Sequence, residues 1–404
     1  MSPAATIGSH SQVRFLPFSY DCHNSQASAL KLLHTLLPQW ASDDSNIELI
    51  RFTDGITNTL LKAVNRRPGL SKADVDREAV LLRAYGNGTA VIIDREREAA
   101  NHELLMRYGL APELLARFGN GMLYRFVRGA VAQPKDLRDP QVLLAIARRL
   151  AQWHATVPCL PDAQAPSGAD AGTCCQSMMM MMKAAAGKPI PNLWMSLQKF
   201  ILALPTATDA QRERQAQLQQ ELDEMVQKLS QRPGLGRNGL VFAHCDLLSG
   251  NVIIHRDAGK ELSVSFIDYE YATPSPAAFD IANHFAEWTG FDCDYKAIPT
   301  SAQRRCFIEE YIKSYAKLSG RAMDIEEETR KLMHEVDMFR GVPGFYWGVW
   351  ALIQAEISHI EFDYPSYAEL RLAEWFDYKA EQDGSRKASG KEKPLREQTW
   401  SRAE

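Results

Sequence analysis

Apolar and polar positions alternate in short runs through the first part of the chain, and this period is typical of β-strands. Five such strands are predicted, at residues 47–52, 59–64, 80–85, 113–118 and 121–127. A helix is predicted at 94–108, because Asp94 can cap its N-terminus and acidic residues follow in its first turn. We therefore expect a small β-rich lobe at residues 46–130, preceded by an N-terminal extension at 1–45 with one short amphipathic helix.

Helical periodicity dominates the remainder of the chain. A helix is predicted at 140–156, because Asp139 can cap it and a proline occupies its first position. Further helices are expected at 209–230 and from 301 onwards. The pattern predicts a larger, mainly helical lobe at 131–378 and a charged, flexible tail at 379–404. The expected fold class is α+β, with two lobes.

Three short apolar runs interrupt the helical pattern, and they are predicted to be strands at 240–243, 252–255 and 264–267. The residues between the second and third strands include Asp257 and Gly259, which favour a turn. The resulting hairpin should return Asp268 to the neighbourhood of Asn251.

The loop between the first two of these strands carries candidate chemistry. Asp246 and Asn251 lie five residues apart in it, and Asp268 follows the hairpin. Phosphoryl transfer from ATP uses a carboxylate beside the acceptor hydroxyl, and a carboxamide and a carboxylate that hold Mg²⁺ on the phosphates. Protein kinases carry these groups as H-R-D-x-x-x-x-N followed by D-F-G. The alternative is that all three are turn or cap residues, but the hairpin and the second Asp favour catalysis.

The spacing therefore predicts Asp246 as the catalytic carboxylate, and Asn251 and Asp268 as Mg²⁺ ligands. His244 is the other candidate of the catalytic loop. We expect it to hold the loop through a backbone hydrogen bond, because Asp246 is better placed to act as the base.

Several segments, in order, resemble the choline/ethanolamine kinase family. They are His-Cys-Asp-Leu-Leu-Ser-Gly-Asn at 244–251, Phe-Ile-Asp-Tyr-Glu-Tyr at 266–271 and Phe-Asp-Ile-Ala-Asn-His-Phe-Ala-Glu-Trp at 279–288. The resemblance extends from about Glu48 to Asp377 and implies a two-lobed protein-kinase-like fold. Leu248, where the choline branch tends to carry Gln, and Thr-Gly-Phe at 289–291 are more similar to the ethanolamine branch.

The resemblance implies an ATP site in the small lobe. The family's phosphate loop corresponds to Asp54, Gly55, Ile56, Thr57 and Asn58. Its glycine allows backbone N–H groups to approach phosphate oxygens closely. The adenine edge is assigned, by resemblance alone, to backbone groups near Arg125, Phe126 and Val127.

Arg83 stands where protein kinases carry a lysine, and a guanidinium can bind a phosphate through two hydrogen bonds. Its alternative reading is a strand residue that faces solvent. Glu98 on the next predicted helix is its expected partner, and Glu96 is the alternative partner.

An amine site is expected among the C-terminal helices. Trp347 and Trp350 are three residues apart and so share a helix face. Aromatic faces attract ammonium groups, although spacing alone would favour an ordinary aromatic core. The resemblance implies that these aromatic residues line the amine pocket, together with Tyr271, Tyr364 and Tyr367.

A primary ammonium group also requires hydrogen-bond acceptors when it is buried. Three acidic residues are candidates for this role. Glu287 ranks ahead of Asp292 and Glu356 because it lies in a matched motif.

Length, charge and cysteine content argue against several classes of protein. The chain has 404 residues, more than one compact core usually supports. Its net charge is −4, without a basic block that would indicate a nucleic-acid surface. Seven Cys without a C-x-x-C motif favour reduced thiols in the cytoplasm. No apolar run reaches the roughly 20 residues of a membrane span.

The motifs predict an ATP- and Mg²⁺-dependent kinase. The resemblance implies that it phosphorylates the hydroxyl of a small amino alcohol, ethanolamine, and that this is the first step of phosphatidylethanolamine synthesis. Choline kinase and an inactive amine-binding scaffold protein are the alternatives. An aminoglycoside phosphotransferase would explain the catalytic motif but not Trp-Gly-Val-Trp at 347–350. The oligomeric state stays open, with a homodimer as one alternative, as does the role of the run Met178–Met182.

Overall fold

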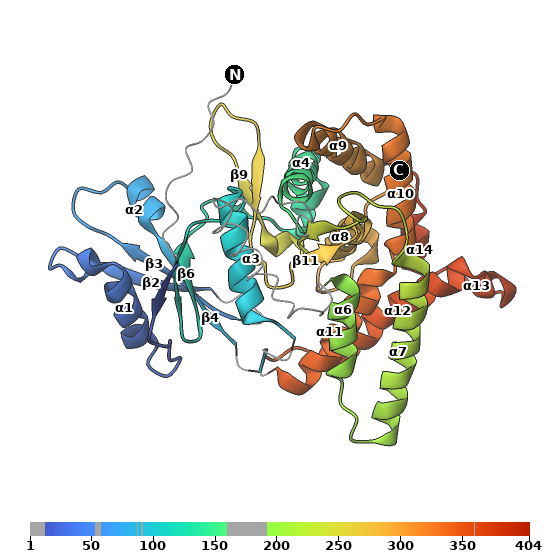
Figure 1. Ribbon diagram of the computed structural model, residues 1–404, viewed down its shortest axis with the longest axis horizontal. Coiled ribbons are helices and arrows are strands. Elements are labelled where there is room, and N and C mark those ends of the chain that lie inside the picture. Colours follow the sequence, from blue (N-terminus) through green and yellow to red (C-terminus); the bar gives the residue numbers. More distant parts are fainter. Residues whose placement is uncertain (1–12, 53–57, 87, 90–91, 160–191, 359) are drawn as a thin grey trace, which may run out of the picture. The chain divides into compact units, whose positions relative to one another are not determined.

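The computed structural model describes residues 13–52, 58–86, 88–89, 92–159, 192–358 and 360–404 (Figure 1). The chain divides into two compact units: unit 1 contains residues 1–89 and 112–128, and unit 2 contains residues 90–111 and 129–404. The segment 90–111, with its helix, is therefore part of unit 2, whereas the sequence had placed it in the small lobe. The run Met178–Met182 lies outside the described residues.

Unit 1 is built on a six-stranded sheet with the order β1-β5-β6-β4-β3-β2. Its strands are β1 (Arg14–Leu16), β2 (Ile47–Phe52), β3 (Asn58–Asn65), β4 (Val80–Tyr85), β5 (Leu114–Phe118) and β6 (Gly121–Arg125). Neighbours are antiparallel except β1 and β5, which pair in parallel. The five predicted strands are present, whereas β1 is too short to show a period in the sequence.

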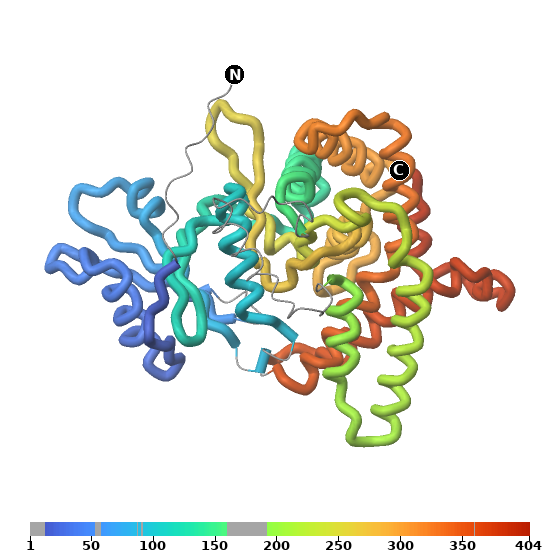
Figure 2. The backbone as a smooth tube through the Cα atoms, in the orientation of Figure 1, coloured from blue at the N-terminus to red at the C-terminus, as the bar shows by residue number. Residues whose placement is uncertain are grey.

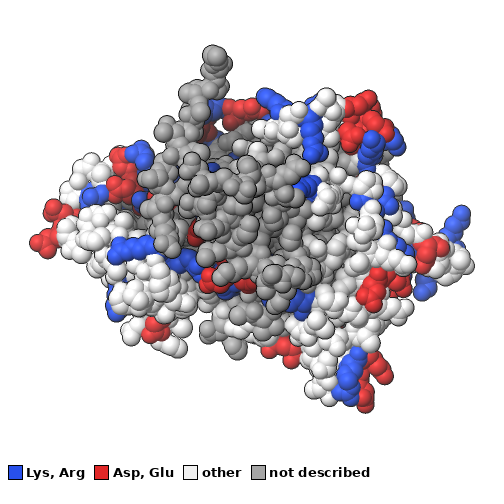
Figure 3. All heavy atoms as spheres, viewed as in Figure 1, with Lys and Arg blue, Asp and Glu red and all other residues white. Residues whose placement is uncertain are grey.

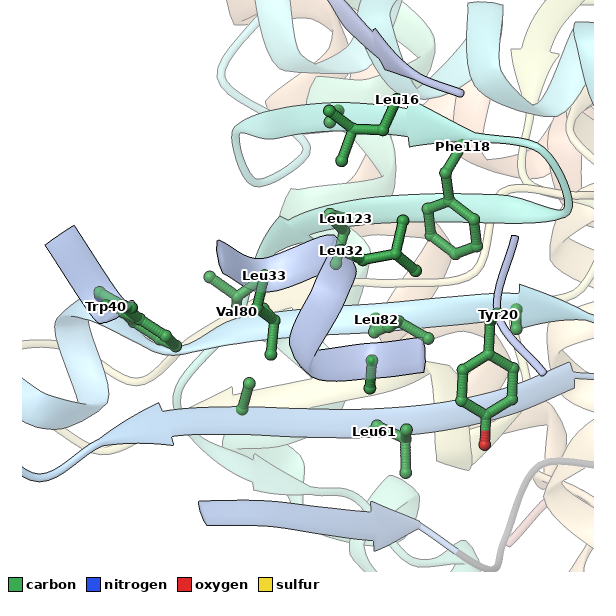
Figure 4. Close-up of a cluster of buried hydrophobic side chains, with 14 residues drawn as sticks. Leu16, Tyr20, Leu32, Leu33, Trp40, Leu61, Val80, Leu82, Phe118 and Leu123 are labelled. Atoms are coloured by element: carbon green, nitrogen blue, oxygen red, sulfur yellow. The ribbon is translucent and has the colours of Figure 1, made fainter. Parts of the chain in front are cut away.

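The residues expected to form an N-terminal extension contribute instead to the core of unit 1. Helix α1 (Ser25–Leu36) places Leu32 and Leu33 in a cluster with Val80 and Leu82 of the central strand β4 (Figure 4). Trp40 of the short 3-10 helix η1 (Pro38–Ala41) joins the same cluster. The prediction of an extension is wrong because the apolar face of α1 is buried with the sheet residues. A further short helix, α2 (Lys72–Glu78), was not predicted.

Unit 2 is mainly helical. Its helices are α3 (Arg95–Arg107), α4 (Pro140–Thr156), α6 (Leu193–Leu202), α7 (Asp209–Leu229), α8 (Ala277–Ala286), α9 (Ser301–Ser319), α10 (Ile325–Phe339), α11 (Val342–Ile357), α12 (Tyr364–Gln382), α13 (Ser385–Ala388) and α14 (Leu395–Trp400). Both predicted N-caps are confirmed, because the side chains of Asp94 and Asp139 accept hydrogen bonds from backbone N–H groups in the first turn of α3 and α4. Figure 2 shows α6 and α7 as a packed pair joined by a short connection.

Helices α11 and α12 approach each other closely. A Cβ atom at Gly348 would lie 2.6 Å from Leu372 Cγ, and one at Gly344 would lie 2.6 Å from the backbone oxygen of Arg371. Glycine at both positions therefore allows the two helices to pack in contact.

Two small sheets surround the predicted catalytic loop in unit 2. The first has the order β10-β9-β7, and the second pairs β11 with β8. Their strands are β7 (Ala130–Val131), β8 (Val241–Ala243), β9 (Val252–His255), β10 (Ser263–Phe266) and β11 (Thr273–Ser275). The predicted hairpin is confirmed by the antiparallel pairing of β9 and β10, in which Phe266 lies opposite Val252.

Helix α14, within the predicted C-terminal tail, is packed. Arg396, Glu397, Thr399 and Trp400 of α14 are all at most 5% exposed. The prediction of a flexible tail is wrong for α14, because Arg396 and Glu397 form buried ion pairs, while most other charged residues of the tail are exposed.

The described part of the face in Figure 3 carries charges of both signs. Lys and Arg are interspersed with Asp and Glu on the described part of the face in Figure 3, which carries no continuous basic area. Within the described ranges, no helix has the length and apolar character needed to cross a membrane.

Candidate active site

The loop that follows β8 is held at its start by Asp280 of α8. The carboxylate of Asp280 accepts hydrogen bonds from the backbone N–H groups of His244 (2.9 Å) and Cys245 (2.7 Å). It also contacts Nε2 of His154 at 2.9 Å. Burial would raise the pKa of Asp280, but the hydrogen bond from His154 and the neighbouring groups hold that pKa below its usual value. Asp280 therefore acts as a structural brace for the start of the loop.

His244 uses both ring nitrogens inside the loop. Nδ1 accepts a hydrogen bond from the backbone N–H of Asp246 at 3.3 Å, so the proton lies on Nε2, which donates to the carbonyl oxygen of Ile267 at 3.0 Å. Burial lowers the pKa of His244 to about 4, and the ring is neutral near pH 7. No ring nitrogen remains to take a substrate proton. The catalytic candidate His244 is therefore a positioning residue.

A second histidine supports the loop further along. Nδ1 of His284 donates to the carbonyl oxygen of Leu247 at 2.8 Å, and its Nε2 accepts from the indole N–H of Trp288 at 3.3 Å. Burial also lowers the pKa of His284 to about 4. His284 thus fixes the backbone directly after Asp246 in its neutral form.

Asn283 links the loop to helix α11. Its side-chain nitrogen donates to the carbonyl oxygen of Cys245 at 3.1 Å, and its Oδ1 accepts from the indole N–H of Trp347 at 2.8 Å. Asn283 was not predicted as a site residue. The available signal was its spacing of three residues from Asp280, which places the two on one helix face.

The three residues predicted to perform the chemistry are brought together. The side-chain nitrogen of Asn251 donates to the carbonyl oxygen of Asp246 at 2.8 Å and to its carboxylate at 3.1 Å. The backbone N–H of Ile267 donates to the carbonyl oxygen of Asn251 at 3.0 Å, which places the next residue, Asp268, beside the loop. Burial raises the pKa of Asp246 well above its usual value, and the charge of Asp268 adds to this.

Two of these residues offer oxygen atoms that suit Mg²⁺. Asn251 makes both of its contacts to Asp246 through nitrogen, and no described residue donates a hydrogen bond to its Oδ1. Asp268 supplies a carboxylate. In the described ranges no group of three or more His, Cys, Asp or Glu residues could hold a metal ion. The residues fit an ion that keeps phosphate and water ligands, as Mg²⁺ usually does.

Four of the five predicted aromatic residues also converge. The rings of Trp347 and Trp350 on α11 lie 5.5 Å apart at 83°. The indole N–H of Trp350 donates to the hydroxyl of Tyr271 at 2.7 Å, and the Tyr271 ring lies edge-on to Trp347 at 5.5 Å. Tyr364 lies 5.9 Å from Trp350, while Tyr367 belongs to a neighbouring ring cluster. Because their indole N–H groups are bonded, the tryptophans can offer ring faces to a cation.

Glu287 is the buried member of the three acidic candidates, because Asp292 and Glu356 are exposed. Its Oε1 accepts a hydrogen bond from Arg371 of α12 at 3.1 Å, and no described residue donates to its Oε2. Burial raises the pKa of Glu287, and the charge of Arg371 opposes this shift. Arg371 was not predicted as a site residue, since nothing in a run of helical residues shows that an arginine points inward.

Arg83 in unit 1 is 4% exposed. It pairs with Leu60 and Met122 in the middle of the sheet, so the solvent-facing alternative is wrong. Of its two predicted partners in unit 2, Glu98 is buried and Glu96 is exposed. Glu98 accepts from Arg95 at 2.9 Å, and its pairing with Arg83 stays a prediction.

The other nucleotide candidates lie in unit 1. Asp54, Gly55 and Thr57 are outside the described residues, and Asn58 is the first residue of β3. The backbone N–H groups of Arg125 and Phe126 donate to the carbonyl oxygens of Glu113 and Ala79, at 2.9 and 3.0 Å. Within the described ranges, no acceptor is bonded to the backbone N–H of Val127. Of the three predicted residues, Val127 is therefore the one whose N–H could bond an adenine edge.

The chain is similar in sequence to known proteins. A family model for choline/ethanolamine kinase matches residues 49–376. Ethanolamine kinase 1 of Mus musculus is 34% identical over 364 residues, which are 87% of this chain and 89% of that protein. A probable ethanolamine kinase of Nematostella vectensis is 35% identical over 347 residues, covering 83% and 88% of the two chains.

Solved structures extend the similarity to the fold. An ethanolamine kinase of Plasmodium vivax superposes with a TM-score of 0.67 at 25% identity, covering 86% of this chain and 87% of that one. A choline kinase of Cryptosporidium parvum superposes with a TM-score of 0.63 at 21% identity, covering 88% and 96%. The predicted kinase-like α+β fold is confirmed.

Proposed function

The chain belongs to the choline/ethanolamine kinase family, and we propose that it transfers the γ-phosphoryl group of ATP to the hydroxyl of ethanolamine. The observation that carries this proposal is the geometry of unit 2, where Asn251 bonds Asp246 and Asp268 follows in the adjoining hairpin. The ethanolamine kinases among its relatives support the choice of acceptor.

Asp246 would orient the ethanolamine hydroxyl and accept its proton. The hydroxyl oxygen then forms a bond to the γ-phosphorus while the bond from that phosphorus to the ADP oxygen breaks. A raised pKa suits this task, because a more basic carboxylate takes up the proton more readily. Mg²⁺, bound by Asn251 and Asp268, would neutralise charge on the phosphates. The hydrogen bonds of His244 and Asp280 to the loop would hold the carboxylate of Asp246 in position beside the acceptor hydroxyl.

We assign the nucleotide to residues of unit 1 and its loop. Asp54, Gly55, Thr57 and Asn58 would cradle the phosphates through backbone and side-chain groups. Arg83 would bind a phosphate through two hydrogen bonds. The backbone N–H of Val127 would bond the adenine edge.

The acceptor ammonium group would lie against the faces of Trp347 and Trp350, with Tyr271, Tyr364 and Tyr367 completing the aromatic surroundings. The free oxygen of Glu287 would accept one of its N–H groups. Ethanolamine can make this hydrogen bond, whereas the quaternary nitrogen of choline has no N–H.

Choline is the second candidate acceptor, because the aromatic cluster could bind a quaternary ammonium group by its ring faces alone. A purely scaffolding role is disfavoured by the joint presence of Asp246, Asn251, Asp268 and Arg83. The cytoplasmic location, the homodimer and the place of the product in phosphatidylethanolamine synthesis stay predictions.

Ethanolamine-dependent release of ADP by the purified full chain tests the proposal, with phosphoethanolamine identified by mass. We expect turnover that requires Mg²⁺ and that is lost in Asp246→Asn but kept in Asp257→Asn, which removes an exposed carboxylate from the hairpin turn. Absence of ethanolamine-dependent ADP release from the unmodified protein would contradict the proposed function.

A further inference from the structure

A buried row of alternating charges runs from Glu287 to the C-terminal helix. Glu287 pairs with Arg371 at 3.1 Å, and Arg371 Nε lies 3.5 Å from Glu374 Oε1. Glu374 Oε2 lies 3.3 Å from Nε of Arg396 on α14. The row continues through Glu397, which pairs with Arg396 at 2.8 Å. Negative and positive groups therefore alternate from the proposed amine site to α14.

These groups are withdrawn from water. The side chain of Arg371 is 0% exposed, those of Glu374 and Arg396 are each 3% exposed, and that of Glu287 is 7% exposed. Removing charges from water costs several kcal/mol per ion unless their partners compensate, and apolar residues would often serve stability equally well. The buried row of ion pairs therefore need not increase the stability of the fold. It can instead contribute to specificity.

The hydrogen bonds of Glu287 are asymmetric. Its Oε1 is held by Arg371, while within the described ranges no residue donates to Oε2. Arg371 is itself fixed on two other sides, because its Nη1 donates to the hydroxyl of Tyr367 at 3.4 Å and its Nε faces Glu374. The guanidinium therefore makes hydrogen bonds to Glu287 and Tyr367, and its contact with Glu374 is an ion pair without a hydrogen bond. These contacts limit the orientations open to the carboxylate of Glu287.

We propose that Arg371 is a positioning residue for acceptor recognition, which holds one oxygen of Glu287 so that the other oxygen is presented to the primary ammonium group. Glu374 and Arg396 extend this support to α14, so that the C-terminal helix contributes to amine selectivity. The inference rests on the proposed function, and it adds that selectivity depends on residues that do not touch the amine.

Several charged or titratable groups act on Glu287. Arg371 and Glu374 of α12 do so in opposite directions. Asp246 of the catalytic loop and Tyr367 and Cys293 also lie within electrostatic reach of Glu287. Arg371 is the positive member of this set. Without it Glu287 would ionise only at higher pH, and ethanolamine binding would weaken at neutral pH.

The test compares kcat/KM for ethanolamine and choline in Arg371→Met, Arg371→Lys and the unmodified full chain. We expect Arg371→Met to lower kcat/KM for ethanolamine by about 10- to 100-fold, mainly through KM, because a charge-assisted contact loses its orientation. The value for choline and the KM for ATP should change little. The acid limb of the ethanolamine profile should move to higher pH, and Arg371→Lys should recover part of the loss.

Arg304→Lys is the matched control. Like Arg371, Arg304 is buried, at 3% exposed, but its hydrogen bonds go to the carbonyl oxygens of Pro299 and of Trp400 in α14, not to Glu287. It should lower the thermal midpoint without changing the ratio of the two amines. Arg396→Met should lower that ratio, although less than Arg371→Met does. An unchanged ratio in Arg396→Met would remove α14 from the proposal.

Equal losses for both amines in the Arg371 variants, with an unmoved pH profile, would overturn the role of Arg371 and leave it as a structural residue. If Arg371→Met does not fold, Arg371→Lys decides by the same ratio. Turnover of ethanolamine by the unmodified protein tests the proposed function, independently of the role of Arg371. The change in the ratio of kcat/KM for ethanolamine to that for choline, on substitution of Arg371, tests the positioning role of Arg371. This test holds whichever amine the unmodified protein prefers.

Discussion

The side-chain amide of Asn251 donates to both the carbonyl oxygen and the carboxylate of Asp246, at 2.8 and 3.1 Å. One residue therefore positions the proposed base and keeps its own Oδ1 available for a cation. The base and the metal site are coupled through a single side chain, so that substitutions at either residue should affect both functions.

Replacing Asp246 by Asn should remove the proton acceptor while leaving its shape. We expect kcat to fall by about 10²–10⁴-fold, because positioning and electrostatics supply the remainder of the rate in phosphoryl transfer. The thermal midpoint and the affinity for ATP, measured by calorimetry, should be close to those of the unmodified protein. A kcat within a few-fold of the unmodified value would remove Asp246 from the role of base.

Asn251→Ala and Asn251→Asp separate the two tasks of Asn251. The Ala variant loses both the metal oxygen and the hydrogen bonds to Asp246, so it should need more Mg²⁺ and turn over slowly even when Mg²⁺ is saturating. The Asp variant regains an oxygen ligand but not the N–H donor, so it should recover Mg²⁺ affinity more than kcat. Titrating Mg²⁺ at fixed ATP measures both, and a Mg²⁺ dependence unchanged in Asn251→Ala contradicts its role as a ligand.

Much of this arrangement could be predicted from the sequence, because it depends on short local patterns. The strand–loop–strand at 240–255 and the hairpin that returns Asp268 follow from runs of apolar residues and a turn. The packing of α1 in unit 1 and of α14 in unit 2 could not be predicted, because burial of a short helix is decided by residues far away in the sequence.

Arg83 should act on the nucleotide. Arg83→Ala is expected to raise the KM for ATP far more than the KM for the amine, because a phosphate contact is lost. Arg83→Lys should recover only part, because an ammonium group cannot form the paired hydrogen bonds of a guanidinium. Initial rates with each substrate varied in turn distinguish the two constants, and an effect confined to the amine KM would exclude Arg83 from the phosphate site.

Stability should fall in mildly acidic solution. His244 and His284 have pKa values of about 4 in the folded protein, while an unfolded histidine titrates near pH 6.5, about its ordinary value. The unfolded chain therefore binds more protons between these values, and the free energy of unfolding decreases as pH falls from about 6.5 to 4, by up to about 1.4 kcal/mol per pH unit for each histidine.

Thermal midpoints at intervals between pH 7 and pH 5 measure this effect. His284→Gln should lower the midpoint at pH 7 but reduce its dependence on pH. His23→Gln, which replaces an exposed histidine, should leave the dependence unchanged. A midpoint independent of pH in the unmodified protein would contradict the buried neutral state of both rings.

The site residues that sequence reasoning missed share one property. Asn283 and Arg371 act through side chains that point inward from helices, and each contacts a residue that is distant in the sequence. Helical periodicity places an apolar face inward but does not indicate which polar residue on that face finds a buried partner. Asp246, Asn251 and Glu287 could be identified because they lie in recognisable motifs.

The ratio of kcat/KM for ethanolamine to that for choline tests the central claim most directly, with both amines assayed side by side by ADP release. Ethanolamine should be preferred by about 10- to 100-fold, because choline leaves the free oxygen of Glu287 unpaired at a cost of about 1–3 kcal/mol. Glu287→Gln should lower this ratio by reducing turnover of ethanolamine more than that of choline. A higher kcat/KM for choline in the unmodified protein would contradict the account.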